Sequence, residues 1–180
     1  MSENTGYMIY ELFKDLPVTR KSKNISRLLR LSKIPLVGRN FLIKVPKLFI
    51  NGRNTKISRG FYCKYGNIEA EDVYLSETYC IDYGIIRIGK HTTFSSEVVI
   101  VTSSHDLDDF RKVIVKPVTI GENVRIEMRV IIFSGVNIGD NTVIGAGSVV
   151  TKDIPAGVLA AGVPCKVIRK INRGTTKWWE

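Results

Sequence analysis

Apolar residues recur at every sixth position through the C-terminal half of the sequence. A first row begins at Ile120, and a second row of aliphatic or small residues follows each of its members by four positions. The two rows are Ile120, Ile126, Ile132, Ile138, Ile144 and Val150, and Val124, Val130, Val136, Thr142, Ser148 and Ile154. An earlier stretch with Ile88, Phe94 and Ile100 repeats the spacing. A period of six matches neither the helical period of about 3.6 residues nor strand alternation.

This period predicts short strands joined by regular corners. Three hexapeptides, about 18 residues, close one triangular coil, and the aliphatic rows of successive coils stack into a continuous core. Glycine and asparagine follow the first row, as corners require. A meandering antiparallel sheet would instead turn every ~8 to 12 residues. We therefore expect an all-β fold, a parallel β-helix of hexapeptide repeats.

The repeat divides the chain into three parts. We expect a basic, partly helical N-terminal segment over 1–50, the β-helix over 51–155 and a C-terminal cap over 156–180. The interval from Ile100 to Ile120 exceeds three hexapeptides by two positions, and its centre is polar and charged. We therefore expect residues 101–118 to leave the coil as a loop.

Composition indicates a globular chain, with 44 % apolar and 24 % charged residues. No apolar run reaches the ~18 to 20 residues of a membrane span, and no basic region precedes an apolar one at the start, so we expect a cytoplasmic protein. The cysteines, Cys63, Cys80 and Cys165, are odd in number and have no close pairing. They are expected to be small buried side chains.

The net charge of +10 lies entirely in residues 1–60, which hold 13 basic and 3 acidic residues, whereas the remainder holds 14 of each. Residues 20–47 alternate basic and apolar side chains. They are typical of a solvated basic surface that caps the coil, of a segment that binds the inner face of a membrane, or of an RNA-binding arm. No RNA-binding signature accompanies the charge, so we expect no nucleic-acid partner.

Only two histidines are present, His91 and His105. His91 lies within the coil, close to the inward row, and we expect it at a surface or corner. His105 lies in the predicted loop beside Asp106, an arrangement typical of a general base. Two histidines are too few for a three-histidine zinc site, so we expect no metal.

The six-residue rows, the motif VIGAGSVVTKDIPAGVLAAGVPCKVIRKI at 143–171 and a loop histidine that follows an Ile-Gly corner resemble the hexapeptide-repeat acyltransferases. Within that family, the chain is similar to the galactoside, maltose and nodulation-factor acetyltransferases and to polysaccharide O-acetyltransferases. The resemblance covers about residues 55–171. It implies a left-handed parallel β-helix, acetyl-CoA as co-substrate, and a homotrimer with each active site between neighbouring coils.

The resemblance also implies roles for single residues. His105 would be the general base for the acceptor hydroxyl. An amide beside Ala146 would bind the pantetheine arm of the coenzyme. The other coenzyme-binding residues would be Thr151, Lys152, Lys166 and Arg169.

Departures from the family pattern concern both substrates. Arg125 stands where many relatives have a tryptophan, and Met128 stands where they have a small residue. The resemblance implies that both positions lie beside the coenzyme. An asparagine on the acceptor side is missing, which leaves Ser76, Glu77 and Asp82 as candidate acceptor contacts. We expect transfer to a sugar hydroxyl of a surface polysaccharide or its precursor. The alternatives are a non-sugar hydroxyl, as in xenobiotic acetyltransferases, and a non-catalytic trimeric scaffold.

Overall fold

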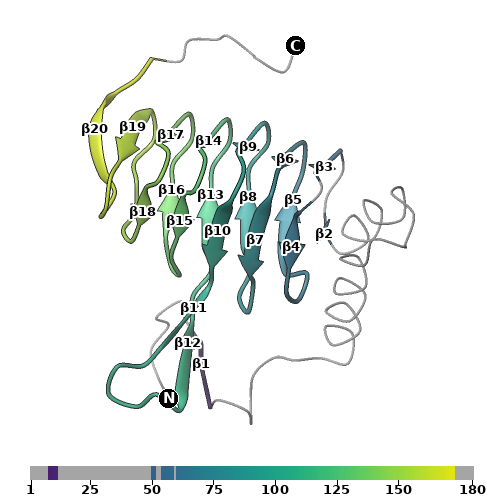
Figure 1. Cartoon of the computed structure of the whole chain (residues 1–180), viewed down its shortest axis with the longest axis vertical. Coiled ribbons are helices and arrows are strands. Elements are labelled where there is room, and N and C mark those ends of the chain that lie inside the picture. The colour runs from purple at the N-terminus through teal and green to yellow at the C-terminus, as the bar shows by residue number, and fades with distance from the viewer. Residues whose placement is uncertain (1–7, 12–49, 52–53, 59, 173–180) are drawn as a thin grey trace.

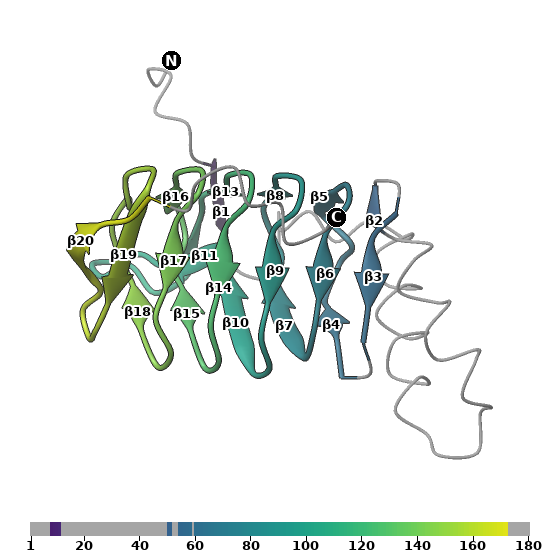
Figure 2. The same ribbon diagram turned by 90° about the horizontal axis from the view of Figure 1, so that it is seen from above.

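Short parallel strands stack into coils, with three strands to each complete coil (Figure 1, Figure 2). The computed structural model describes residues 8–11, 50–51, 54–58 and 60–172. This architecture confirms the expected all-β helix of hexapeptide repeats.

The strands form three faces of a prism, and each strand pairs with its equivalents in the coils before and after it. The first face contains β2 (Ile50–Asn51), β5 (Ile68–Ala70), β8 (Ile86–Ile88), β13 (Val118–Ile120) and β16 (Asn137–Ile138). The second contains β3 (Lys56–Ile57), β6 (Tyr74–Leu75), β9 (Thr93–Phe94), β14 (Arg125–Ile126), β17 (Val143–Ile144), β19 (Val158–Ala161) and β20 (Lys166–Lys170). The third contains β4 (Tyr62–Cys63), β7 (Thr78–Ile81), β10 (Val98–Val101), β15 (Ile131–Ile132) and β18 (Val149–Val150).

The predicted inward rows form the core. Every member of both rows from Ile120 to Ile154 is at most 5 % exposed. The earlier row members Ile88, Phe94 and Ile100 are also buried. The three cysteines are buried and unpaired, as expected. Burial of aliphatic side chains between stacked coils is what stabilises such short strands.

The corner between the first and second faces explains the recurring asparagines. Asn54, Asp72, His91, Asn123 and Asn141 occupy equivalent positions there, with φ between 52° and 59°. Asparagine and aspartate accept this left-handed conformation better than other residues with a side chain. The Asn123 side-chain amide donates a 2.8 Å hydrogen bond to that of Asn141. His91 is therefore a corner residue, as expected.

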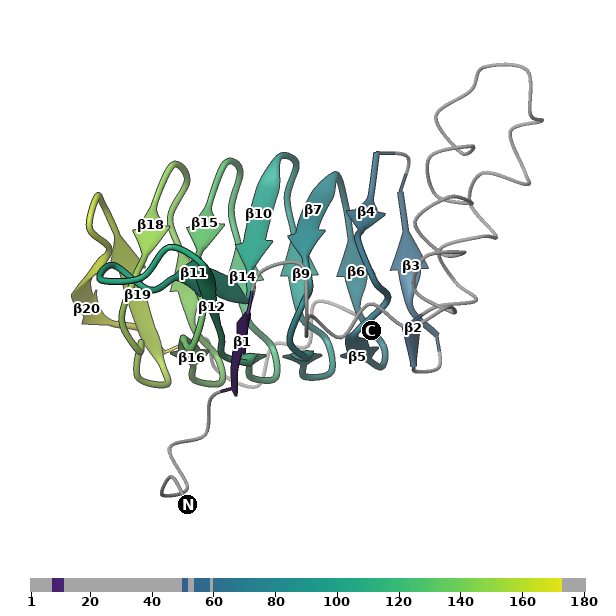
Figure 3. The same ribbon diagram turned by 90° about the horizontal axis from the view of Figure 1, so that it is seen from below.

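The loop is an antiparallel hairpin of β11 (Ser103–His105) and β12 (Lys112–Val115), and β1 (Met8–Glu11) pairs with β12 on its other edge (Figure 3). The interval from Ile100 to Ile120 was expected to hold one full coil and two extra residues, and this expectation was wrong. Ile120 pairs directly with Ile88, so no coil lies within the interval. Equivalent positions are 32 residues apart across the hairpin and 16 to 20 apart in the other coils. The hairpin accounts for the whole of that difference, and it leaves the prism at Thr102, because Val101 and Val118 still belong to β10 and β13.

The ends of the coil also differ from the expected boundaries by a few residues. Ile50 already belongs to β2, and the parallel second face continues past Pro155 to β19. β20 then pairs antiparallel with β19 and covers the last edge. Apart from β1 and Ile50, residues 1–50 lie outside the described residues, and with them the predicted helical content and the basic stretch 20–47. No helix in the described ranges has the length and apolar character to cross a membrane.

Candidate active site

Apart from Lys166 and Arg169 on β20, the predicted site residues lie at two corners of the prism, at opposite ends of the third-face strands. We call the corner that follows the third face the hairpin corner; it comprises residues 64–67, 82–85, 102–117, 133–136 and 151–153. The corner that precedes the third face is called the far corner; it comprises residues 76–77, 95–97, 127–130 and 145–148. The hairpin projects from the side of the prism (Figure 1).

His105 ends β11 and is exposed on the hairpin. Its Nδ1 lies 2.9 Å from the carbonyl oxygen of Phe110, and the two rings lie 6.0 Å apart, centroid to centroid. Because a carbonyl oxygen can only accept, this hydrogen bond requires a proton on Nδ1. In the neutral imidazole Nε2 then carries the free lone pair, which is the form a general base needs.

Asp106 does not orient the His105 ring, contrary to what its position in sequence suggested. Its Oδ1 accepts hydrogen bonds from the amides of Asp108 and Asp109, 2.9 and 3.0 Å long, which shape the hairpin tip. Asp109 in turn pairs with Arg111, whose hydrogen bond lowers the pKa of Asp109 to about 2. The acidic residues of the tip are therefore structural, and the partner of His105 is a backbone carbonyl.

Ala146 lies at the far corner, where its flanking amides are occupied. Gly145 N–H donates to the Ala160 carbonyl and Gly147 N–H donates to the Met128 carbonyl, at 2.9 and 2.8 Å. Among the described residues, the Ala146 N–H itself donates no hydrogen bond. The amide left for a ligand is therefore that of Ala146, rather than of a neighbour.

Lys166 and Arg169 point to the same side of β20 because of a bulge. Lys166 pairs with Ala161 and Arg169 with Leu159, and the register shifts between them. Regular alternation would place residues three apart on opposite faces, and one extra residue reverses this. Both cations therefore share the outer side with Leu159, opposite buried Val158 and Ala160.

This pair of cations adjoins the far corner. A Cβ on Gly145 would lie 2.8 Å from Cβ of Ala161, the partner of Lys166. Thr151 and Lys152 are exposed at the other end of β18, on the hairpin corner. The structure therefore groups Ala146 with Lys166 and Arg169, and it places Thr151 and Lys152 with the hairpin instead.

Arg125 and Met128, the two departures from the family pattern, lie on β14 and at the far corner. Arg125 Nε donates to Glu127 Oε1 at 2.6 Å, and Ser95 Oγ donates to Glu127 Oε2 at 3.2 Å. Arg125 is thereby held against the second face. Met128 is 46 % exposed, one coil before Ala146. The Met128 carbonyl accepts the Gly147 N–H, so Met128 lies next to the turn that holds Ala146.

The candidate acceptor residues differ in accessibility. Ser76 and Glu77 form a tight turn at the far corner, and Glu77 is exposed. Asp82 is 0 % exposed, and its carboxylate accepts three backbone hydrogen bonds, from Lys64, Tyr65 and Asn67. Burial raises the pKa of Asp82, although these three N–H donors lower it. Asp82 holds the corner together rather than facing a ligand.

Sequence reasoning missed a cluster of Lys64, Tyr65 and Tyr83 on the hairpin corner. Lys64 Nζ donates to Tyr83 Oη at 2.8 Å, and the two tyrosine rings are 4.9 Å apart, centroid to centroid. Tyr65 and Tyr83 are separated in the sequence by the length of one coil. That spacing was the available signal, but the six-residue phase is irregular before Ile88.

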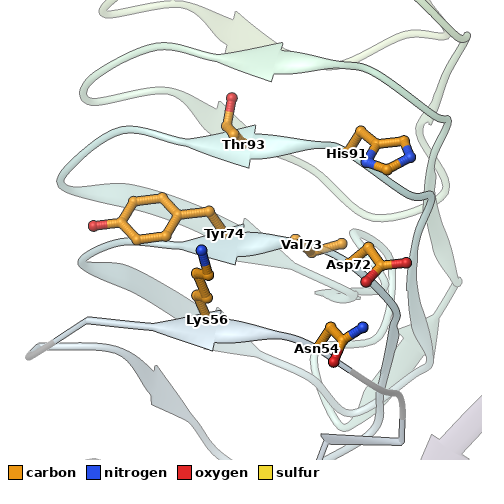
Figure 4. Close-up of a pocket in the computed structure, with 7 residues that line it drawn as sticks. All are labelled: Asn54, Lys56, Asp72, Val73, Tyr74, His91 and Thr93. Atoms are coloured by element: carbon orange, nitrogen blue, oxygen red, sulfur yellow. The ribbon is translucent and has the colours of Figure 1, made fainter. Parts of the chain in front are cut away.

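A cavity of about 590 Å³ lies elsewhere, on the second face and its leading corner (Figure 4). Asn54, Asp72 and His91 line it at the corner, and the Lys56 side chain extends towards Tyr74. None of the predicted site residues lines it. No group of three potential metal ligands occurs within the described ranges.

Comparisons with known proteins agree with this architecture. The family model described as bacterial transferase hexapeptide (six repeats) matches residues 117–152. A galactoside O-acetyltransferase of Escherichia coli (strain K12) is 42 % identical over 140 residues, 76 % of this chain. That alignment spans only 64 % of the bacterial enzyme's length. A galactoside O-acetyltransferase of Lactococcus lactis is 35 % identical over 99 % of this chain and 82 % of its own.

Solved structures share the fold over most of the chain. A maltose O-acetyltransferase from Clostridium difficile 630 has a TM-score of 0.79 and 33 % identity, covering 90 % of this chain and 92 % of its own. A galactoside acetyltransferase in complex with coenzyme A has a TM-score of 0.69 and 30 % identity, covering 87 % and 85 %. The chain therefore belongs to the hexapeptide-repeat acetyltransferase family.

Proposed function

We propose that the protein transfers the acetyl group of acetyl-CoA to a hydroxyl group of a sugar, with His105 as general base. The observation that carries this proposal is the hydrogen bond between His105 Nδ1 and the Phe110 carbonyl, which leaves Nε2 free to accept a proton. Relatives described as galactoside and maltose O-acetyltransferases support sugar as the acceptor class.

His105 moves one proton in each direction. Nε2 takes the proton of the acceptor hydroxyl as its oxygen bonds to the acetyl carbonyl carbon. His105 returns that proton to the coenzyme sulfur when the carbon–sulfur bond breaks. The steps balance without a covalent enzyme intermediate. The buried cysteines take no part, because burial raises the pKa of Cys63 and Cys80 and disfavours their thiolates.

The far corner and β20 suit acetyl-CoA. Lys166 and Arg169 are exposed cations without a carboxylate partner among the described residues, so they can bind the coenzyme phosphates. The Ala146 N–H can bind an amide carbonyl of the pantetheine arm. Thr151 and Lys152 would also contact the coenzyme. They would do so from the hairpin corner of the same copy or of a neighbouring copy.

A homotrimer would complete the site. His105 and Ala146 lie at opposite ends of the third-face strands, so this chain alone leaves them apart. The outer side of that face is apolar in every strand: Tyr62, Tyr79, Val99, Ile131 and Val149. The first face instead presents Glu69, Arg87, Thr119 and Asn137. An apolar face of this kind favours contact between copies, which would bring His105 of one copy to Ala146 of the next.

The hairpin tip supports the same arrangement. Leu107 and Phe110 are 84 % and 67 % exposed, and both lie beside His105. Exposed apolar side chains on a projecting hairpin are stabilised when a second copy covers them.

The acceptor is proposed to be part of a surface polysaccharide or its precursor. An acceptor screen that includes non-sugar alcohols distinguishes this acceptor from one of the xenobiotic type.

The decisive experiment measures thiol release from acetyl-CoA with and without a saccharide acceptor. We expect His105→Ala to lower acceptor-dependent release at least ~100-fold, the usual contribution of a general base, while coenzyme affinity measured by calorimetry is unchanged. His91→Asn is the matched control, since asparagine occupies the equivalent corner positions. Undiminished turnover in His105→Ala would remove the mechanism. Absence of coenzyme binding at millimolar concentration would favour a non-catalytic scaffold.

A further inference from the structure

Lys64, Tyr65 and Tyr83 form an ordered cluster on the hairpin corner. Lys64 Nζ lies 4.7 Å from the centroid of the Tyr83 ring and 5.4 Å from that of Tyr65. Its hydrogen bond to Tyr83 Oη is 2.8 Å long. All three side chains are half-buried, so the cluster is both fixed and accessible.

The direction of the hydrogen bonds makes the cluster a donor site. Burial raises the pKa of Tyr83, but hydrogen bonds from Lys64 and Tyr65 more than offset it, and the net pKa is lowered. Burial and the hydrogen bond to Tyr83 raise the pKa of Tyr65. Because Lys64 Nζ donates to Tyr83 Oη, the hydroxyl of Tyr83 keeps its own proton to offer to a ligand.

The charge of Lys64 is not neutralised by an ion pair among the described residues. Asp82, which binds the Lys64 amide, directs its carboxylate to three backbone N–H groups. An ammonium group carries three protons, and Tyr83 accepts one of them. The cluster therefore presents a positive charge and N–H and O–H donors to solvent.

At this corner Tyr83 lies one coil before the base of the hairpin, and Lys64 and Tyr65 lie two coils before it. Gly84, the residue after Tyr83, donates its N–H to Thr102 Oγ1 at 2.8 Å. A Cβ on Gly84 would lie only 2.8 Å from a methyl group of Val115, so Tyr83 is fixed against the hairpin base. His105 follows Thr102 by three residues, a rise on the order of 10 Å along the strand. An acceptor that bridges Tyr83 and His105 must span this rise and the spacing of about 4.8 Å between neighbouring coils.

We infer that this cluster binds an anionic group of the saccharide acceptor, either the carboxylate of a sugar acid or the phosphate of a sugar phosphate. The cluster offers hydrogen-bond donors and a net positive charge, which match an anionic oxygen group. A neutral sugar hydroxyl would bind there less tightly. The inference rests on the proposed function, since it places the acceptor between the cluster and His105.

The test compares galactose, galacturonic acid and galactose 6-phosphate as acceptors in the thiol-release assay. For the wild type we expect kcat/KM for one of the anionic acceptors to exceed that for galactose about tenfold, as a charge-assisted hydrogen bond supplies. Lys64→Met and Tyr83→Phe should each remove most of that preference through KM, with kcat and galactose turnover little changed. Lys90→Met, a lysine at another corner, is the control.

Two results would overturn the inference: a wild type that turns over galactose at least as well as both anionic sugars, or a Lys64→Met variant that loses all three acceptors equally. Failure of the proposed function is recognised separately. If no acceptor supports thiol release, calorimetry measures the binding of galacturonic acid and galactose 6-phosphate to the protein, and this binding tests the cluster by itself. Binding that Lys64→Met abolishes and His105→Ala retains supports the cluster as an anionic-sugar site, and no binding to the wild type refutes it.

Discussion

Two buried threonines of the core differ in whether their hydroxyl groups are hydrogen-bonded. Thr78 and Thr92 are both 0 % exposed and occupy comparable places beside corners. Thr92 Oγ1 donates to the Gly121 carbonyl at 2.8 Å and accepts from Val124 N–H at 3.0 Å. Thr78 Oγ1 has no hydrogen-bond partner within the described residues. The same side chain therefore stabilises one corner and leaves a buried hydroxyl unsatisfied at another.

This contrast predicts opposite effects of one substitution. Thr78→Val should raise the free energy of unfolding by about 1 kcal/mol, because it removes a buried polar group that lacks a partner. Thr92→Val should lower it by about 1 to 2 kcal/mol, because it leaves a buried carbonyl and amide unpaired. Urea denaturation of both variants measures the two changes. Equal destabilisation in both would mean that Thr78 has a partner in solution.

At the scale of elements, the β20 bulge decides which cations share one side of that strand. Strict alternation along residues 166–170 would put Lys166 and Ile168 on one side. The register shift in the pairing with β19 instead puts Lys166 and Arg169 together. Neither the spacing of the cations nor their number predicts this, because a bulge depends on how the last coil meets its cap.

The bulge leads to a test within one strand. Changing both Lys166 and Arg169 to Gln should raise KM for acetyl-CoA about tenfold with kcat unchanged, since the lost contacts are charge-assisted hydrogen bonds at an exposed site. Lys170→Gln removes one positive charge from the opposite side of β20 and should leave KM within twofold, whereas Lys166→Gln or Arg169→Gln alone, each also a loss of one charge, should raise it. The increase in KM should shrink at high salt. An equal effect of Lys170→Gln would show that only general charge matters.

At the scale of the whole molecule, the proposed active site would be completed by a second copy of the chain. The separation of His105 from Ala146 by the width of the third face predicts complementation between inactive variants. His105→Ala and Ala146→Phe should each be inactive as homotrimers. Mixed trimers should recover about a quarter of wild-type activity, because some interfaces pair an intact His105 with an intact Ala146. Trimers that mix and stay inactive would place both residues in one copy's site.

The basic segment 20–47 is predicted to bind either a membrane surface or the end of the coil. The nine basic residues between 20 and 47, with no acidic residue among them, predict binding to anionic vesicles that weakens as salt rises. Because β1 pairs with β12 of the hairpin that carries His105, deletion of the N-terminus would disturb the proposed site as well. Replacing these lysines and arginines by Gln is the cleaner variant. Co-sedimentation that is equal on neutral and anionic vesicles would leave the segment as a cap of the coil.

The sequence by itself determined the fold, because an inward row at every sixth residue has one economical packing, a stack of three-sided coils. It also located His105 in a loop outside the repeat, since a break in a regular period is visible without coordinates. Membership of the family followed from the C-terminal motif at 143–171.

Tertiary structure decided what periodicity does not encode. The hairpin is far longer than the excess of two positions that the spacing suggested, because Ile120 stacks directly on Ile88. The orienting group of His105 is the Phe110 carbonyl rather than Asp106, since hairpin pairing brings residue 110 back to residue 105. Lys64 and Tyr83, 19 residues apart, met because stacking joins equivalent corners of neighbouring coils. Each of these contacts joins residues that are not adjacent in sequence, so only the folded chain fixes it.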